Sequence, residues 1–265
     1  PDGPASPRSA AHPPAIRSMR AGVVVSEEAG VRYLHFGSRW IQGAMRLQRP
    51  WALELEYTRQ MMAPLAMRPA GPWPRDVLIV GLGAASQLRF LWRHRPAARF
   101  TVVEIDEQVV SVATQSFKLP DDERIRLVVG DAVDEVPSLA GSFDLVLIDG
   151  FDARGSAGRL DSVPFYAACR ERLAPGGVLS VNLLSRTRGV KPSLARLAEA
   201  FGERVLVLPS CVSGNTVAFA WREGGPRVDP ADWPASALAL KRETGLDLRT
   251  PLEGIDREQV SRVVA

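Results

Sequence analysis

Apolar and polar residues follow different patterns on the two sides of residue 76. From residue 76 onward, short continuous apolar runs alternate with longer stretches whose apolar residues recur at helical spacing. Strands that are apolar along their whole length are typical of a parallel sheet with helices on both faces. The sequence therefore predicts an α/β fold built on a doubly wound, mostly parallel seven-stranded sheet. The expected strands are residues 76–80, 100–106, 125–129, 143–149, 178–184, 205–208 and 216–221. The expected helices are residues 86–94, 107–117, 133–139, 162–173 and 192–201.

The residues before 76 suggest a small separate unit. Strand-like runs at 22–26 and 31–36 flank a Glu-Glu-Ala-Gly turn, which favours a β-hairpin, and residues 40–45 are expected to add a strand. Residues 52–67 predict a helix with one apolar face, formed by Leu53, Tyr57, Met61 and Leu65.

We divide the chain into four segments on this basis. Residues 1–20 are rich in Pro, Ala and Ser, and we expect them to be disordered or an expression remnant. Residues 21–70 form the small N-terminal unit of a β-hairpin plus a helix. Residues 71–225 form the α/β domain, and residues 226–265 form a C-terminal helical extension.

Composition and charge narrow the range of functions. The net charge is only +3, and the arginines are scattered among acids, so we expect no nucleic-acid partner. No apolar run approaches the ~20 residues of a membrane span, so we expect no membrane partner. The two cysteines lie far apart and the three histidines do not cluster, which argues against a disulfide framework, a metal site and a histidine-based triad. Cysteine usage and the lack of a span make the cytoplasm the expected location.

The candidate chemistry lies where the strands end, because ligands of open α/β sheets bind outside the carboxyl ends of the strands. The first strand is followed by a turn with Gly81 and Gly83, where the backbone can approach a ligand closely. Glu104 ends the second strand, 23 residues after Gly81, and can accept hydrogen bonds from both hydroxyls of a ribose. Up to this point a nicotinamide-binding domain fits equally well.

Two later features favour an S-adenosyl-type nucleoside. The third strand ends in Gly130-Asp131-Ala132, which places the Asp131 carboxylate where an adenine amino group could donate to it, beside Ala132. A Leu-Ala-Pro-Gly-Gly-Val turn, common in adenosylmethionine-dependent transferases, precedes the fifth strand. The alternative for Glu104 and Asp131 is that they cap helices or lie solvated at strand ends.

The fourth strand ends in Asp149-Gly150-Phe151-Asp152. With this motif the chain resembles the spermidine synthases and related aminopropyltransferases from about residue 42 to residue 221. The resemblance implies that Asp149 helps to activate an acceptor amine and that Asp152 holds the acceptor. It also implies that Gln42 contacts the nucleoside and that Tyr166 takes part in substrate binding. From the residues alone, a function is favoured for Asp149, although many methyltransferases carry an acid at this strand end, and Asp152 could equally be a turn-forming residue.

Such a transferase would take decarboxylated S-adenosylmethionine as donor, with intact S-adenosylmethionine as the alternative. Its second substrate would be a small-molecule amine, such as a polyamine. A primary amine with a pKa of about 10.4 is almost entirely protonated at neutral pH. One carboxylate could accept its proton, and a second could anchor the cationic chain. This chemistry requires no metal.

The chain departs from the family pattern at several positions. Ala84 stands where the family has an aspartate that contacts the amine end of the donor and would repel the carboxylate of intact adenosylmethionine. Thr58-Arg59-Gln60 aligns with the family's Tyr-His-Glu, although a shift of one residue would retain Tyr57. An arginine facing the acceptor would disfavour a polyamine. Ala153 replaces a family proline, in a glycine-rich loop that is expected to be either a mobile lid or an ordinary surface loop.

Three functions follow from these features. The first is aminopropyl transfer to a polyamine amine. The second is methyl transfer from intact adenosylmethionine, and Ala84 favours it. The third is a non-catalytic relative that binds a nucleoside or a partner protein, because the N-terminal unit is shortened. The resemblance also implies that a homodimer is possible.

Overall fold

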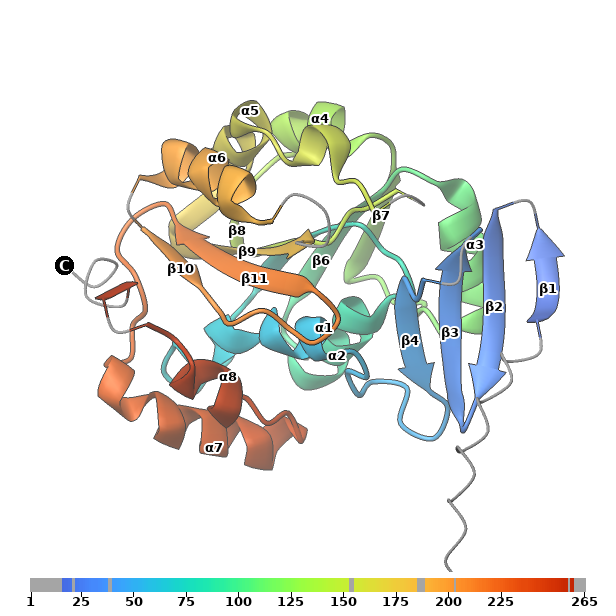
Figure 1. Ribbon diagram of the computed structural model, residues 1–265, viewed down its shortest axis with the longest axis horizontal. Coiled ribbons are helices and arrows are strands. Elements are labelled where there is room, and N and C mark those ends of the chain that lie inside the picture. The colour runs from blue at the N-terminus through green and yellow to red at the C-terminus, as the bar shows by residue number, and fades with distance from the viewer. Residues whose placement is uncertain are drawn as a thin grey trace, which may run out of the picture.

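The computed structural model describes residues 16–20, 22–37, 40–152, 155–184, 189–202, 204–256 and 258–259. These residues form two β-sheets, and helices cover both faces of the larger sheet (Figure 1).

The larger sheet has seven strands in the order β10-β11-β9-β8-β5-β6-β7. Strands β5 to β9 are parallel to one another, whereas β11 and β10 are antiparallel to their neighbours. This arrangement confirms the predicted doubly wound, mostly parallel sheet. The strands are β5 Asp76–Val80, β6 Arg99–Glu104, β7 Ile125–Val129, β8 Phe143–Ile148, β9 Leu173–Leu184, β10 Val205–Val207 and β11 Asn215–Trp221.

Helices cover this sheet from both sides, and the strands divide their side chains between two apolar layers. On β5, Val77 and Ile79 pack into one layer, and Leu78 and Val80 pack into the other. A strand that is buried on both faces needs apolar residues at every position, which explains the continuous apolar runs in the sequence. The helices of this part are α2 Ser86–His94, α3 Glu107–Ser116, α4 Ala132–Glu135, α5 Val163–Arg172 and α6 Lys191–Phe201, with 3₁₀ turns η2 Val136–Ser138 and η3 Gly158–Leu160.

Strand β9 starts at Leu173 and not at residue 178 as predicted. It continues through the Pro-Gly-Gly turn, with an irregular register against β8 between Phe143 and Leu145. A Cβ atom on Gly177 would lie 2.8 Å from the carbonyl oxygen of Phe143. Glycine therefore lets the two backbones approach where the sequence suggested only a turn.

The smaller sheet is an antiparallel meander of β1 Ile16–Arg20, β2 Val23–Glu28, β3 Val31–Phe36 and β4 Gly43–Arg46. The predicted hairpin is confirmed as β2 and β3. The expectation of disorder over residues 1–20 is wrong for residues 16–20, because they pair with β2. Residues 1–15 lie outside the described part of the chain.

The single helix predicted over residues 52–67 is also wrong. The segment forms α1 Glu56–Gln60 and then the 3₁₀ turn η1 Ala63–Leu65. Pro64 explains the break, because a proline ring clashes with the carbonyl group four residues earlier and offers no N–H. The segment is nevertheless well packed, and Met61, Met62 and Ala63 are fully buried.

Arg89 of α2 joins the α/β domain to the segment that follows the smaller sheet. Its side chain is 3% exposed, and its Nε donates to the carbonyl of Pro50 at 2.8 Å. Its Nη1 donates to the carbonyls of Phe117, at 2.6 Å, and Ala84. Burial lowers the pKa of this guanidinium to about 9, and no carboxylate of the described residues forms a salt bridge with it. Backbone carbonyls alone therefore hold a buried charge at this junction.

The C-terminal extension is helical as predicted, with η4 Pro230–Asp232, α7 Trp233–Thr244 and α8 Arg249–Glu253. Its apolar residues, including Trp233 and Leu240, belong to the same buried layer as Met61 of the N-terminal unit. An ion pair of 2.7 Å between Arg95 and Glu243 also ties it to the α/β domain. Among the described residues, no helix combines the length and apolar character that crossing a bilayer would require.

Candidate active site

A cavity of about 560 Å³ lies at the carboxyl ends of β5, β6, β8 and β9. The N-terminal unit closes it from the other side through residues 40–43 and 55–58, and residues 212–215 complete its wall. The site therefore lies where the strand order of the sheet predicts a ligand. Its lining includes the predicted residues Gln42, Gly81, Gly83, Glu104 and Asp149.

The glycine turn after β5 brings the ends of two neighbouring strands together. Gly81 has φ of +90°, and a Cβ atom there would lie 2.3 Å from the carbonyl oxygen of Asp149. Only glycine combines this left-handed backbone with such a close approach. Gly83 also has a positive φ, of +49°. The turn therefore forms part of the cavity wall and fixes the backbone of Asp149.

Glu104 is buried at the end of β6 and is held by backbone N–H groups. Its carboxylate accepts hydrogen bonds from Leu82 N at 2.8 Å and from Asp106 N at 3.1 Å. Burial raises the pKa of Glu104, although these backbone donors oppose the shift. The carboxylate is thus oriented towards the cavity by the glycine turn, as a ribose acceptor would have to be.

Asp149 is the centre of a side-chain network. Its Oδ1 accepts a hydrogen bond from Asn182 Nδ2 at 2.8 Å, and its Oδ2 accepts one from Gln87 Nε2 at 3.2 Å. The hydroxyl of Tyr57 also donates to this carboxylate. Burial raises the pKa of Asp149 to about 6, and the three donors limit the shift. A carboxylate that titrates near 6 is well suited to exchange protons at neutral pH.

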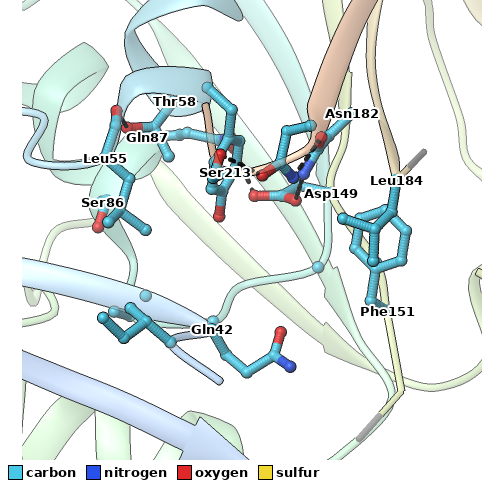
Figure 2. A pocket seen from close by; sticks show the side chains of 18 of the residues that line it. Gln42, Leu55, Thr58, Ser86, Gln87, Asp149, Phe151, Asn182, Leu184 and Ser213 are labelled. Atoms are coloured by element: carbon cyan, nitrogen blue, oxygen red, sulfur yellow. Dashed lines mark hydrogen bonds between the residues drawn. The ribbon is translucent and has the colours of Figure 1, made fainter. Parts of the chain in front are cut away.

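The network continues from Asp149 to the loop after β10. Asn215 Nδ2 donates to Asn182 Oδ1 at 3.0 Å, and Ser213 Oγ donates to Asn215 Oδ1 at 2.7 Å. Figure 2 shows Gln87, Asn182 and Ser213 on the same side of the cavity as Asp149, with Gln42 across from them.

Asp131 and Ala132 are not among the described residues that line this cavity. Asp131 caps α4 by accepting a hydrogen bond from Val133 N at 2.9 Å, and it pairs with Arg159 at 3.2 Å. This geometry fits the alternative of helix capping. The adenine contact of Asp131 stays a prediction.

Asp152 and Tyr166 are likewise not among the described residues lining this cavity. Asp152 is exposed, and its Oδ1 accepts a hydrogen bond from Ser156 N at 2.8 Å within its own loop. Tyr166 lines a second cavity, of about 450 Å³, where its hydroxyl donates to Asp161 at 2.9 Å. The structure therefore brings Asp149 together with Gln42, Gly81, Gly83 and Glu104, and it leaves Asp131, Ala132, Asp152 and Tyr166 outside this cavity. Ala153 lies outside the described residues.

Comparison with known proteins places the chain in a family. The model of the spermine/spermidine synthase domain matches residues 55–185. A polyamine aminopropyltransferase from Chromobacterium violaceum is 36% identical over 211 residues, which make up 79% of this chain and 79% of that protein. The chain belongs to the spermine/spermidine synthase family. A polyamine aminopropyltransferase from Neisseria meningitidis is 31% identical over 244 residues, or 91% of this chain and 92% of that protein.

Solved structures agree with this membership at the level of the fold. A spermidine synthase in complex with the transition state analogue AdoDATO superposes with a TM-score of 0.64. The two share 22% sequence identity, and the match covers 84% of this chain and 85% of that one.

Of the Tyr-His-Glu pattern that the resemblance implied before the main domain, the shifted alignment retains only the tyrosine, Tyr57. Tyr57 contacts Asp149, whereas the hydroxyl of Thr58 donates to the carbonyl of Leu55 at 2.7 Å. Arg59 does not face the acceptor side as the unshifted alignment implied, since its Nη1 donates to the carbonyls of Glu54, at 2.9 Å, and Leu53.

Sequence reasoning missed four cavity residues of this family member: Glu56, Tyr57 as a partner of Asp149, Gln87 and Asn182. Asn182 lies near the carboxyl end of β9, so reading every strand end for polar residues would have found it. Gln87 and Glu56 lie on helices, and nothing in their local pattern separates them from solvated polar residues.

Proposed function

We propose that this chain transfers the aminopropyl group of decarboxylated S-adenosylmethionine to an amine nitrogen of a polyamine. One observation carries the proposal. Three carboxylates, those of Glu56, Glu104 and Asp149, line one cavity, and the described residues that line it include no lysine, arginine or histidine. Both substrates of this reaction are cations, a sulfonium and an ammonium, which such a cavity attracts. Membership of the spermine/spermidine synthase family supports the same reaction.

Glu104 and the glycine turn hold the donor in this proposal. The Glu104 carboxylate accepts hydrogen bonds from the ribose hydroxyls, while Gly81 and Gly83 let the backbone lie against the nucleoside. Gln42 contacts the nucleoside from the opposite wall. The donor supplies the reactive carbon next to its sulfonium.

Asp149 serves the acceptor. An ionised carboxylate offers about four lone-pair positions, so its three protein donors leave room for an amine. The acceptor ammonium loses one proton to Asp149, and its nitrogen then attacks the aminopropyl carbon bound to sulfur. A C–N bond forms as the C–S bond breaks, and the electron pair of that bond passes to sulfur. Methylthioadenosine leaves as a neutral thioether, and Asp149 returns the proton to water.

Methyl transfer from intact adenosylmethionine is the second candidate, and Ala84 favours it. Ala84 is 3% exposed and packs against Gly43, where a Cβ atom would lie 2.5 Å from its own Cβ. Position 84 therefore places no charge against a donor carboxylate. The three carboxylates of the cavity nevertheless disfavour the intact donor, because none of the described lining residues offers that group a cation.

A product assay with each donor tests the proposal. The wild-type protein, a four-carbon diamine and decarboxylated donor should yield methylthioadenosine and an aminopropylated amine, measured by mass spectrometry. Asp149→Asn should lower kcat by about 10²–10⁴-fold while binding methylthioadenosine as tightly as the wild type does, because an amide cannot accept the proton. Methylated product from intact donor, with no methylthioadenosine from the decarboxylated one, would refute aminopropyl transfer.

A further inference from the structure

Glu56 is a cavity carboxylate that the reaction at Asp149 does not use. It is the first residue of α1, directly before Tyr57, whose hydroxyl donates to Asp149. Both Glu56 and Tyr57 line the cavity. The carboxylates of Glu56 and Asp149 therefore line the same cavity.

Glu56 lies near the loop after β10. Burial, and next the charge of Glu56, raise the pKa of the Cys211 thiol to about 11, whereas the charge of Arg59 opposes this shift, so both charged side chains lie near Cys211. The residues that follow, Val212 and Ser213, line the cavity, and Val212 is fully exposed. Glu104, in contrast, ends β6 beside the glycine turn.

Glu56 makes no salt bridge within 4.0 Å to a cation of the described residues. Arg59, one turn further along α1, points its guanidinium at backbone carbonyls of Leu53 and Glu54. A first-turn acid also interacts favourably with the helix dipole, which is a purely structural role. That role is small in a helix of five residues and does not explain a place in the cavity wall.

The residue expected to anchor the acceptor chain does not occupy this cavity. Asp152 is exposed and accepts a hydrogen bond from Ser156 N in its own loop. The far end of a diamine stays protonated at neutral pH and needs a carboxylate partner when it leaves water. Glu56 is the remaining described carboxylate of the cavity, once Glu104 is assigned to the donor and Asp149 to the attacking nitrogen.

We propose that Glu56 anchors the second ammonium of the acceptor and so selects diamines and polyamines over monoamines. The inference rests on the proposed aminopropyl transfer. Asp149 holds the nitrogen that attacks, and Glu56 holds the charged nitrogen further along the same chain. A monoamine lacks the second ammonium that Glu56 would bind, so Glu56 does not contribute to its affinity.

Kinetics with paired acceptors test the role of Glu56. Butane-1,4-diamine and n-butylamine differ only in the second amine. Glu56→Gln should raise KM for the diamine at least tenfold, change kcat little, and leave the monoamine parameters unchanged. Glu56→Asp keeps the charge on a shorter stem and should show a smaller loss. Glu107→Gln is the matched control, because Glu107 is also a first-turn acid, of α3, but is exposed and outside the described cavity lining.

Direct binding separates failure of this inference from failure of the proposed function. Calorimetry with butane-1,4-diamine, in the presence of saturating methylthioadenosine, should show at least tenfold weaker binding to Glu56→Gln than to the wild type. If the wild type transfers aminopropyl groups but Glu56→Gln keeps its preference for the diamine, Glu56 has no such role and the function stands. If no acceptor is turned over yet the diamine binds through Glu56, the proposed function fails alone. Absence of diamine binding to the wild type overturns the inference. Thermal unfolding of each variant shows whether it is folded. If Glu56→Gln does not fold, the binding and kinetics of Glu56→Asp test the role of Glu56 instead.

Discussion

At the residue scale, the state of Asp149 is set by two opposing effects. Removal from water raises its pKa, whereas hydrogen bonds from Asn182, Tyr57 and Gln87 stabilise the charged form. The result, a pKa of about 6, leaves the carboxylate mostly ionised at neutral pH and close enough to titration to exchange protons. The network thus tunes a base without any histidine taking part in it.

The pH dependence of activity should report this balance. The active form of Asp149 is deprotonated, so kcat/KM should fall as the pH drops below about 6. Tyr57→Phe removes a donor that lowers the pKa, so the pKa rises and the acid limb should move to higher pH. Tyr166→Phe, which removes a hydroxyl bonded to Asp161 in the other cavity, should leave the limb in place. An unmoved limb in Tyr57→Phe would show that Asp149 is not the titrating group.

Glu104 gives a second prediction at this scale. Glu104→Ala should weaken binding of methylthioadenosine by roughly 1–3 kcal/mol, the cost of losing charged hydrogen bonds to the ribose. Glu107 lies three residues further along and is exposed, so Glu107→Ala should bind methylthioadenosine as tightly as the wild type does. Calorimetry measures both, and equal affinity in Glu104→Ala and the wild type would place the nucleoside elsewhere.

At the scale of elements, the joined ends of β5 and β8 are the most constrained point of the site. Gly81→Ala forces a left-handed backbone on alanine and places its Cβ 2.3 Å from the carbonyl oxygen of Asp149. Gly141→Ala imposes a similar φ, +82° against +90°, but its Cβ meets nothing within 4 Å. Chemical denaturation should show about 1 kcal/mol of destabilisation for Gly141→Ala. Gly81→Ala should lower the free energy of unfolding by several kcal/mol, because the backbone at Asp149 must move to make room for the Cβ atom. Equal losses would contradict the close contact.

Elements were predictable from sequence where burial imposes a simple pattern. Residues 76–80 and 125–129 are strands with the predicted bounds, because continuous apolar runs between helices leave few alternatives. Residues 52–67 misled the prediction, because their apolar period fits a helix but Pro64 breaks it. The apolar period records which residues are buried, and a helix followed by a 3₁₀ turn can bury them equally well.

The candidate site was predictable only in part, for a related reason. Glu104 and Asp149 follow parallel strands, and the sheet itself brings such residues together. Asp152 and Tyr166 were assigned by resemblance, and the structure gives them neighbours outside the cavity. Glu56 reaches the cavity only because the N-terminal unit packs against the α/β domain at the carboxyl ends of its strands. That contact is between distant segments and leaves no local signal.

At the scale of the whole molecule, Arg89 is one of the links between the N-terminal unit and the α/β domain. Arg89→Met keeps the volume but leaves the carbonyls of Pro50, Ala84 and Phe117 without their donor. Each buried carbonyl left unsatisfied costs about 1–3 kcal/mol, so the free energy of unfolding should drop by several kcal/mol. Arg126→Met, on β7 and exposed, is the control for loss of a charge. A stability loss confined to 0.5 kcal/mol or less, the range of ordinary surface changes, would show that the junction contributes little.

The homodimer implied by the family resemblance stays a prediction at this scale. Sedimentation of the full chain over a range of concentrations measures it directly.

The junction at Arg89 also bears on how such a protein can be rearranged by evolution or by engineering. The boundary drawn at residue 70 follows a change in composition, yet the guanidinium that satisfies Pro50 on one side belongs to a helix on the other. Cutting the chain there, or grafting on a β unit from another relative, would remove one of the three main-chain carbonyls that hold this buried cation. A graft at this boundary should therefore need a carbonyl acceptor for Arg89 from the new unit at the place that Pro50 now occupies.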